Sequence, residues 1–325
     1  MMKRLHDKKS LIAVIVLLII LLITVAYQVS LGTTKNKPPG HVSMIVYGED
    51  KERWENMREG AYLVCQENNA ELSLLTMLSE NDPAEQEEII EREIEDGADA
   101  LIIAPCNSKA IREYMGSKKI NIPVVYLETQ ENKQLGEIDI GTDDYKMGYS
   151  LGEEIAANES DIVTIAIISD NTDRDSVRLR EKGLRDAITG KVGKIINWSR
   201  EEYRTNANTR MFIQRAIVSE ATDVIVTFDN STTDALLDAL DNLNKTGRVY
   251  CISTSNKAIY NLYNKEIEAL EYPDEFSMGY LAAMNALDRS HAVMKYTGKE
   301  IEYRMVRKEN MYDEENQTLL FPFVD

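Results

Sequence analysis

Short apolar runs alternate with segments of helical periodicity over most of the chain, and this alternation limits the folds that the chain can adopt. Each run is rich in β-branched residues and ends at polar or glycine residues, which is typical of a buried strand. Eight such runs follow one another: 41–47, 71–77, 99–105, 121–128, 161–168, 194–199, 222–228 and 248–254. Strands separated by helices of about 10 to 15 residues predict right-handed βαβ units and parallel sheets.

The eight runs form two successive sets with the same alternation, which indicates two doubly wound α/β domains. The length of 325 residues agrees with this, because a domain commonly holds about 100 to 200 residues. Ligands of such sheets bind outside the carboxyl ends of the strands. The functional site is therefore expected among the residues that directly follow the strands.

An uncharged apolar segment precedes this body. Residues 11–26 carry no charged side chain, and the extension to residue 29 approaches the ~20 residues needed to cross a bilayer. The basic flank at 1–10 predicts a cytoplasmic N-terminus, so the body of the chain is expected outside the cytoplasm. We interpret 11–29 as a transmembrane anchor or uncleaved signal, followed by a linker at 30–40. The alternative is a signal peptide cleaved near 24–26, which would release a secreted protein.

Composition argues against several classes of protein. Charged residues make up 28% of the chain and hydrophobic residues 43%, as in water-soluble globular proteins. The net charge of −18 argues against nucleic-acid binding, because phosphate contacts need concentrated Lys and Arg. Cys65, Cys106 and Cys251 show no metal-ligand spacing and lie in or beside apolar segments, so we expect buried thiols. A bridge between Cys65 and Cys106 is left open.

Signatures of catalysis are scarce. None of the histidines His6, His41 and His291 follows a strand, which argues against a His-based triad or metal site. Neither G-x-G-x-x-G nor G-x-x-x-x-G-K-[ST] occurs, so a dinucleotide or P-loop enzyme is not expected. We predict a non-enzymatic protein without cofactor or metal. An enzyme that uses carboxylates is the alternative.

The segment SVRLREKGLRDAI (176–188) follows an apolar run and is expected to form a helix. One of its three arginines falls on a different side of that helix from the other two. On a helical wheel, Arg180 falls on the apolar side of the helix. That side holds Val177, Leu184, Ala187 and Ile188, and the opposite side holds Arg178, Lys182 and Arg185. An arginine that faces inward needs a partner or a polar cleft. Its planar fork suits a hydroxylated ligand, and an internal salt bridge is the alternative.

The sequence R-L-R-E-K-G-L after an apolar strand resembles the ligand-arginine helix of the type I periplasmic binding proteins. These include ribose- and galactose-binding proteins and the effector domains of lac-type repressors. DGADALIIAPCNSKAI and NIPVVYLE are similar to the family's third and fourth strands, and DDYKMGYSLGEEIA and EYPDEFSMGYLAA to its first and last interdomain crossings. The resemblance begins near residue 41 and reaches the C-terminus. It implies two Rossmann-like lobes joined by a three-segment hinge: 41–142 plus 272–296, and 143–271 plus 297–325.

The resemblance also implies a set of ligand-binding positions. They are Asp50, Arg53, Trp54, Glu128, Arg180, Tyr203, Asp229, Thr254 and Glu271. Trp54 falls where the family has an aromatic ring that stacks on a sugar, and core packing is its alternative role. Thr129 replaces an Arg of the family pattern, and Glu271 replaces a Gln. If the carboxylates after the strands converge with Arg180, the site is more acidic than a ribose site, and an amino sugar or another cationic polar ligand is expected.

These inferences predict a membrane-tethered, extracytoplasmic solute-binding protein for a sugar-like ligand, such as a monosaccharide or an amino sugar. Contacts from both lobes would favour a closed state of the protein. The closed form would be presented to an ABC permease or to the ectodomain of a sensor histidine kinase, as in two-component sensing. A sensory ectodomain whose degenerate cleft serves protein contacts is the alternative. A transcription regulator is not expected, because a membrane span stands where a helix-turn-helix would be needed.

Overall fold

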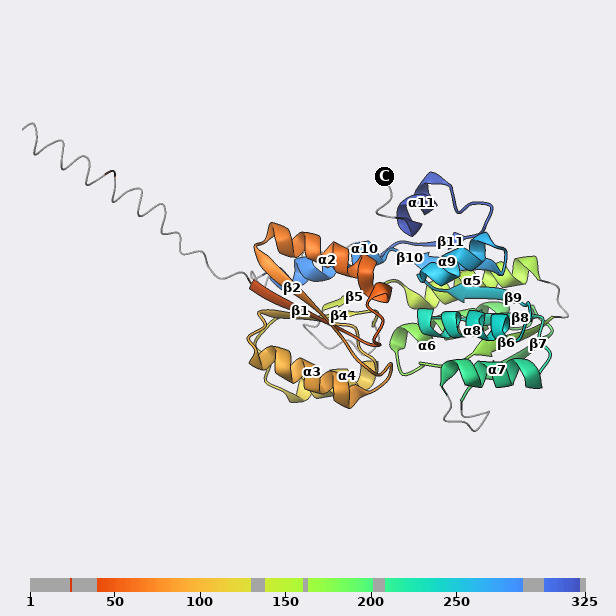
Figure 1. Ribbon diagram of the computed structural model, residues 1–325, viewed down its shortest axis with the longest axis horizontal. Coiled ribbons are helices and arrows are strands. Elements are labelled where there is room, and N and C mark those ends of the chain that lie inside the picture. The colour runs from red at the N-terminus through yellow and green to blue at the C-terminus, as the bar shows by residue number, and fades with distance from the viewer. Residues whose placement is uncertain are drawn as a thin grey trace, which may run out of the picture. The chain divides into compact units, whose positions relative to one another are not determined.

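The computed structural model describes residue 24 and residues 40–129, 138–159, 163–200, 208–288 and 301–321. Residues 41–325 form one compact unit that contains two sheets. The strand order is β2-β1-β3-β4-β5 in the first sheet and β11-β10-β9-β8-β6-β7 in the second. Figure 1 shows helices along the faces of both sheets. The predicted α/β fold with parallel-sheet lobes is confirmed.

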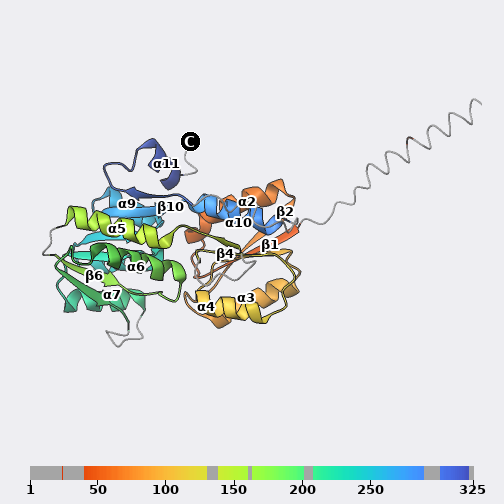
Figure 2. The same cartoon turned by 180° about the vertical axis from the view of Figure 1, so that it is seen from behind.

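The first lobe is built on the five-stranded sheet, in which β3 pairs in parallel with β1 and β4, and β4 pairs in parallel with β5. Helices α2 and α10 cover one face, and α3 and α4 cover the other (Figure 1 and Figure 2). Its elements are β1 (Gly40–Val46), the 3-10 helix η1 (Glu52–Trp54), α2 (Glu55–Glu67), β2 (Ala70–Thr76), α3 (Pro83–Glu95), β3 (Ala100–Ile103), α4 (Ser108–Ser117), β4 (Val124–Leu127), β5 (Ile138–Ile140) and α10 (Glu275–Leu287).

The second lobe is built on the six-stranded sheet, in which β6 to β10 are parallel and β11 lies antiparallel at the edge. One face packs against α5 and α6, and the other packs against α7, α8 and α9. Its elements are α5 (Asp144–Asn158), β6 (Thr164–Ile168), α6 (Asp175–Ile188), β7 (Lys194–Trp198), α7 (Thr209–Ser219), β8 (Val224–Thr227), α8 (Asn230–Asn242), β9 (Arg248–Ile252), α9 (Asn256–Tyr263), β10 (Ile267–Pro273), β11 (Tyr303–Val306) and α11 (Glu314–Leu320).

Strand β6 shows why the apolar runs of the sequence are continuous rather than alternating. Ile165 and Ile167 face the core beneath α5 and α6, whereas Ala166 and Ile168 face the core beneath α7 and α8. Helices on both faces therefore bury every side chain of a central parallel strand. The same two-sided burial explains why most of the internal strands had a recognisable apolar run.

Several features of the structure go beyond the sequence-based expectations or limit them. Strands β5, β10 and β11 and helices α9 and α11 were not predicted, since runs of three to eight residues carry little periodicity. Cys65, Cys106 and Cys251 are buried and free, so the Cys65–Cys106 bridge is not formed. The lobe boundaries at residues 142, 271 and 296 remain a prediction.

The predicted membrane anchor at 11–29 lies outside the described residues, apart from Thr24. Among the residues that the structure does describe, no helix is long and apolar enough to cross a membrane.

Two pairs of helices contact each other through their backbones. A Cβ atom added at Gly148 of α5 would lie 1.9 Å from the carbonyl oxygen of Arg180 in α6, and one added at Gly183 would lie 2.0 Å from that of Tyr145. In the first lobe, a Cβ at Gly279 of α10 would lie 1.8 Å from the carbonyl oxygen of Met57 in α2. Only glycine permits this approach, and in the second lobe the contact sets the position of Arg180.

Gly148→Ala is expected to lower the free energy of unfolding by about 1 to 3 kcal/mol or more, because the new methyl group forces the two helices apart. Urea unfolding followed by circular dichroism measures this. Gly247→Ala is the matched control: its added Cβ would lie 3.7 Å from Ile225 Cδ1, an ordinary contact. Equal unfolding midpoints for the two variants would show that the α5–α6 contact is not tight.

Candidate functional site

Polar side chains that follow the strands of both sheets contact one another between the lobes. We call this group the interlobe network. It comprises Tyr47, Arg53, Glu80, Glu128, Asp144, Arg174, Arg180, Asp229, Thr254 and Glu275. Tyr47 follows β1 and Glu128 follows β4, whereas Asp229 follows β8 and Thr254 lies after β9. The site thus forms at the carboxyl ends of parallel strands, where the sequence predicted it.

Arg180 lies on the buried side of α6, as the helical wheel predicted, and is 5% exposed. Its Nε donates to Asp144 Oδ1 at 2.8 Å, and its Nη1 donates to the carbonyl oxygen of Phe228 at 3.0 Å. Its Nη2 lies 3.8 Å from Glu128 Oε1 and has no hydrogen-bond partner, nor has Oδ2 of Asp144. The internal salt bridge, which was the alternative prediction for Arg180, is therefore present, and one donor and one acceptor remain available.

Glu128 presents its carboxylate from a left-handed backbone conformation, with φ of +52°. Its Oε2 accepts from the Tyr47 hydroxyl at 2.8 Å, and its Oε1 accepts from Arg53 Nη2 at 3.2 Å. Burial by itself would raise the pKa of Glu128, but Arg53 and Arg180 hold that pKa below its ordinary value. A non-glycine residue in this conformation costs about 1 to 3 kcal/mol, and such strain is concentrated at functional positions.

Arg53 and Trp54 have different surroundings from those that the resemblance implied. Arg53 forms ion pairs with Glu275 and Glu128, and its guanidinium lies 4.4 Å from the centroid of the Trp54 ring. Trp54 is fully buried, and its Nε1 donates to the carbonyl oxygen of Tyr47 at 3.2 Å. The ring has the surroundings of a core residue, and stacking on a sugar would require Arg53 to move.

Asp229 and Thr254 are also engaged within the protein. Asp229 begins α8 as its N-cap, and its Oδ1 accepts from the backbone N–H of Thr232 at 2.8 Å. Thr254 Oγ1 donates to Glu275 Oε1 at 2.9 Å. Both positions therefore support the network whether or not a ligand is bound.

Glu271, in β10, is a fully buried carboxyl group. Neither of its side-chain oxygens has a hydrogen bond of good geometry, although the Ser150 hydroxyl lies close enough to lower its pKa. Burial raises the pKa of Glu271 to about 8, against smaller lowering effects of the Ser150 hydroxyl and the Arg180 guanidinium. A pKa above 7 favours the neutral form of Glu271 at pH 7, and a neutral carboxyl can donate and accept a hydrogen bond as an amide does. The departure from the family's Gln is therefore smaller than the sequence suggested, and Glu271 adds no charge to the site.

Asp50, by contrast, has no contact with the network among the described residues. Asp50 is exposed, and its Oδ1 accepts from the backbone N–H of Glu52 at 2.9 Å. Tyr203 falls in the stretch 201–207, outside the described residues. The ligand-binding role of all nine positions remains a prediction.

Sequence reasoning missed five members of the network: Glu80, in the loop after β2, and four others, which are Tyr47, Asp144, Arg174 and Glu275. Asp144 and Glu275 each occupy the first turn of the helix that follows a crossing between the lobes. Arg174 precedes α6 as its N-cap residue and is 2% exposed. The available signal was position: each of the four directly follows a strand or lies at the start of a helix.

The family-model comparison gives the relationship of this chain to known proteins. The model of the periplasmic binding protein domain family matches residues 42–290. The chain belongs to this family. The predicted relationship to the type I periplasmic binding proteins is thereby confirmed.

Similar proteins support the same fold. A D-ribose/D-allose-binding protein of Pseudomonas aeruginosa is 23% identical over 261 residues, which cover 75% of this chain and 79% of that protein. The glucose-galactose binding protein GanP from Geobacillus stearothermophilus has a TM-score of 0.69 at 18% identity, covering 85% of this chain and 100% of that chain. The XylFII-LytSN complex has a TM-score of 0.67 at 16% identity, covering 83% of this chain and 98% of that chain. At these identities, the structural likeness establishes the fold.

The free energy of unfolding is expected to fall as pH rises from about 4.5, the ordinary pKa of a Glu side chain, to about 8, the pKa of buried Glu271. In this window the folded protein holds a proton that the unfolded chain has lost, so each pH unit lowers stability by up to about 1.4 kcal/mol. Glu271→Gln removes this contribution. Its stability relative to the original protein should therefore increase from pH 5 to pH 8 in urea unfolding.

Glu268→Gln is the matched control, because Glu268 lies in the same strand and is exposed. Parallel pH profiles for Glu271→Gln and the unaltered protein would contradict a neutral Glu271.

Proposed function

We propose that this protein is a membrane-tethered, extracytoplasmic receptor that closes two lobes on a sugar-like solute. The observation that carries the proposal is a set of buried hydrogen-bonding atoms without partners around Arg180. They are Arg180 Nη2 and Asp144 Oδ2, together with the side-chain oxygens of Glu271, which only the Ser150 hydroxyl approaches. Each such atom costs about 1 to 3 kcal/mol when left unpaired. A polyhydroxylated solute supplies donors and acceptors of the kind that this set lacks.

The chemistry of the network favours a neutral or amine-bearing sugar. Its three arginines face five carboxylates, those of Glu80, Glu128, Asp144, Asp229 and Glu275. This excess of acidic groups disfavours a sugar acid and is compatible with an amino sugar. The relatives also support the sugar class, since solved structures of two solute binding proteins hold D-arabinose and D-fucose.

Closure of the lobes is the proposed mechanism of signalling. Arg180 belongs to the second lobe and Glu128 to the first, so a solute that contacts both groups binds the closed arrangement better than an open one. Such differential affinity is what shifts an equilibrium between conformations. We propose that the lobes divide as 41–142 plus 272–296 and 143–271 plus 297–325, with the crossings acting as the hinge.

The partner that reads the closed form is an ABC permease or the ectodomain of a sensor kinase. The apolar segment 11–29 supports a tethered protein, with its body outside the cytoplasm. A solved complex of a protein of this fold, XylFII, with LytSN supports a second protein as the partner. We place the kinase ectodomain first, because a receptor anchored by its own helix stays at the membrane beside such a partner.

One observation favours a second candidate function, a sensory ectodomain that binds no solute. The side chains of Arg53, Glu128, Asp229 and Thr254 already have partners within the protein. In that case the network is a structural core of the closed form, and the surface of the lobes makes the functional contacts.

The melting temperature of the full-length protein in detergent can be measured with each member of a panel of pentoses, hexoses and amino sugars. We expect at least one of these sugars to bind and to raise the melting temperature. At 100 times its Kd the sugar adds about 2.7 kcal/mol of stability. Arg180→Lys keeps the positive charge beside Asp144 but lacks the second donor, so affinity should fall about 10- to 100-fold. Arg185→Lys on the same helix is the matched control and should bind as the unaltered protein does.

A panel without any thermal shift would favour the second candidate. Equal affinities of the Arg180→Lys and Arg185→Lys variants would place the solute elsewhere. Chemical conversion of a sugar would contradict the prediction that the protein is not an enzyme.

A further inference from the structure

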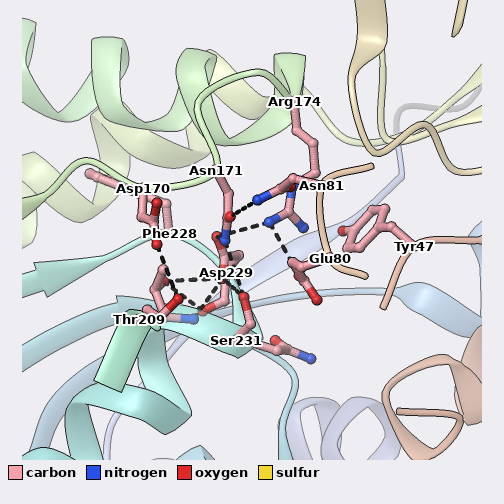
Figure 3. Close-up of polar contacts among 12 residues, drawn as sticks. Tyr47, Glu80, Asn81, Asp170, Asn171, Arg174, Thr209, Phe228, Asp229 and Ser231 are labelled. Carbon is pink, nitrogen blue, oxygen red and sulfur yellow. Dashed lines mark hydrogen bonds and ion pairs between the residues drawn. The ribbon is translucent and has the colours of Figure 1, made fainter. Parts of the chain in front are cut away.

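Arg174 lies between the lobes, with its guanidinium enclosed by groups from both. Its Cζ lies 4.1 Å from the centroid of the Tyr47 ring, and its Nη2 lies 3.3 Å from Glu80 Oε1 and 3.6 Å from Asp229 Oδ2. Figure 3 shows the guanidinium between the Glu80 carboxylate and Asp229, with the Tyr47 ring beside it. Tyr47 and Glu80 belong to the first lobe, and Asp229 belongs to the second.

The first lobe also binds the turn that carries Arg174, residues 171–175. Asn81 Nδ2 donates to Asn171 Oδ1 at 2.6 Å, and the backbone N–H of Asp175 donates to Ser108 Oγ at 2.9 Å. Thr129 Oγ1 donates to Asp175 Oδ2 at 2.8 Å. This turn therefore contributes several of the direct contacts between the lobes, beside those of Arg180 with Glu128 and of Thr254 with Glu275.

The geometry around Arg174 is that of a binding site for an organic cation. A ring face and carboxylates on either side are the groups by which proteins hold free ammonium and guanidinium ions. Here the cation is a side chain of the protein itself. Without it, Glu80 and Asp229 would face each other across the lobes with no positive charge between them, and their repulsion would favour separation.

We propose that Arg174 is a built-in occupant of the interlobe site: a tethered cation that holds the lobes together without solute and that a soluble guanidinium or ammonium group can replace. The inference rests on the proposed closure of the lobes and not on the identity of the sugar. It also makes Arg174 a specificity-determining residue, because a solute with a cationic group competes with it and a neutral sugar does not.

The ion pairs of Arg174 leave two of its hydrogen-bond donors unsatisfied. Its Nε and Nη2 have no hydrogen-bond partner although the side chain is buried. The two carboxylates neutralise its charge at ion-pair distance but do not satisfy these donors. A ligand whose cationic group makes the missing hydrogen bonds therefore gains over the tethered side chain.

Pulsed electron paramagnetic resonance between one spin label on each lobe tests the proposal on the full-length protein in detergent. Cysteines introduced at exposed Tyr62 of α2 and Val218 of α7 accept the labels, while the three native thiols are buried. The parent protein should show one short distance. Arg174→Ala should lengthen it, methylguanidinium should restore the short distance, and methylurea, which has a similar shape but no charge, should not.

Two further variants keep the outcome decisive. Arg185→Ala removes an arginine of α6 whose partners Glu181 and Asn197 lie in its own lobe, and it should leave the distance unchanged. Glu80→Gln removes the first-lobe carboxylate at a position that is 35% exposed, and it should lengthen the distance even if Arg174→Ala fails to fold.

An unchanged distance in Glu80→Gln or in folded Arg174→Ala would overturn the proposal, as would equal restoration by methylurea. These distances are measured without sugar. A failure of the proposed sugar binding would therefore not change them, and the two proposals can be tested separately.

Discussion

The ion pair between Arg180 and Asp144 exists because α5 and α6 touch through their backbones. Gly148 lies one turn after Asp144 and contacts the carbonyl oxygen of Arg180, so both charged side chains leave the helix crossing at the same level. Opposite charges compensate for each other's loss of hydration only at short range and with good geometry. Larger residues at the crossing would separate the pair. The second lobe thus has a rigid support that holds Nη2 of Arg180 towards Glu128 of the first lobe.

The first lobe contributes an equally constrained group by different means. Glu128 adopts a left-handed conformation that glycine would adopt without strain, yet glycine would supply no carboxylate. Tyr47 and Arg53 hold its two oxygens, so the strained backbone and the hydrogen bonds fix one orientation. The interactions of the Glu128 carboxylate with Arg53 and Arg180 offset the cost of the strained backbone. Both lobes therefore present pre-oriented charged groups to the space between them.

The fold was predictable from the sequence to the extent that it depends on local periodicity. Two-sided burial of the central strands gave continuous apolar runs, and the apolar side of α6 identified Arg180 as facing inward. The partners could not be predicted: Arg53 pairs with Glu275, 222 positions along the chain, and no local pattern connects them. The role of Arg174 could not be predicted for a related reason. It is the N-cap of α6, and a helical wheel gives no direction for a residue that precedes the helix.

The charge expected for the site also changed once burial was known. The sequence predicted an acidic site from the carboxylates of Glu128, Asp229 and Glu271. In the structure, Arg53 and Arg180 compensate the charge of Glu128, and Arg174 lies beside Asp229. Burial favours the neutral form of Glu271. The local charge that a solute meets therefore depends on whether Arg174 is in place. With Arg174 between the lobes, the carboxylates of Glu80 and Asp229 are engaged. With Arg174 displaced, the same carboxylates and the Tyr47 ring are available to a cation, so the solute that binds and the position of Arg174 determine each other.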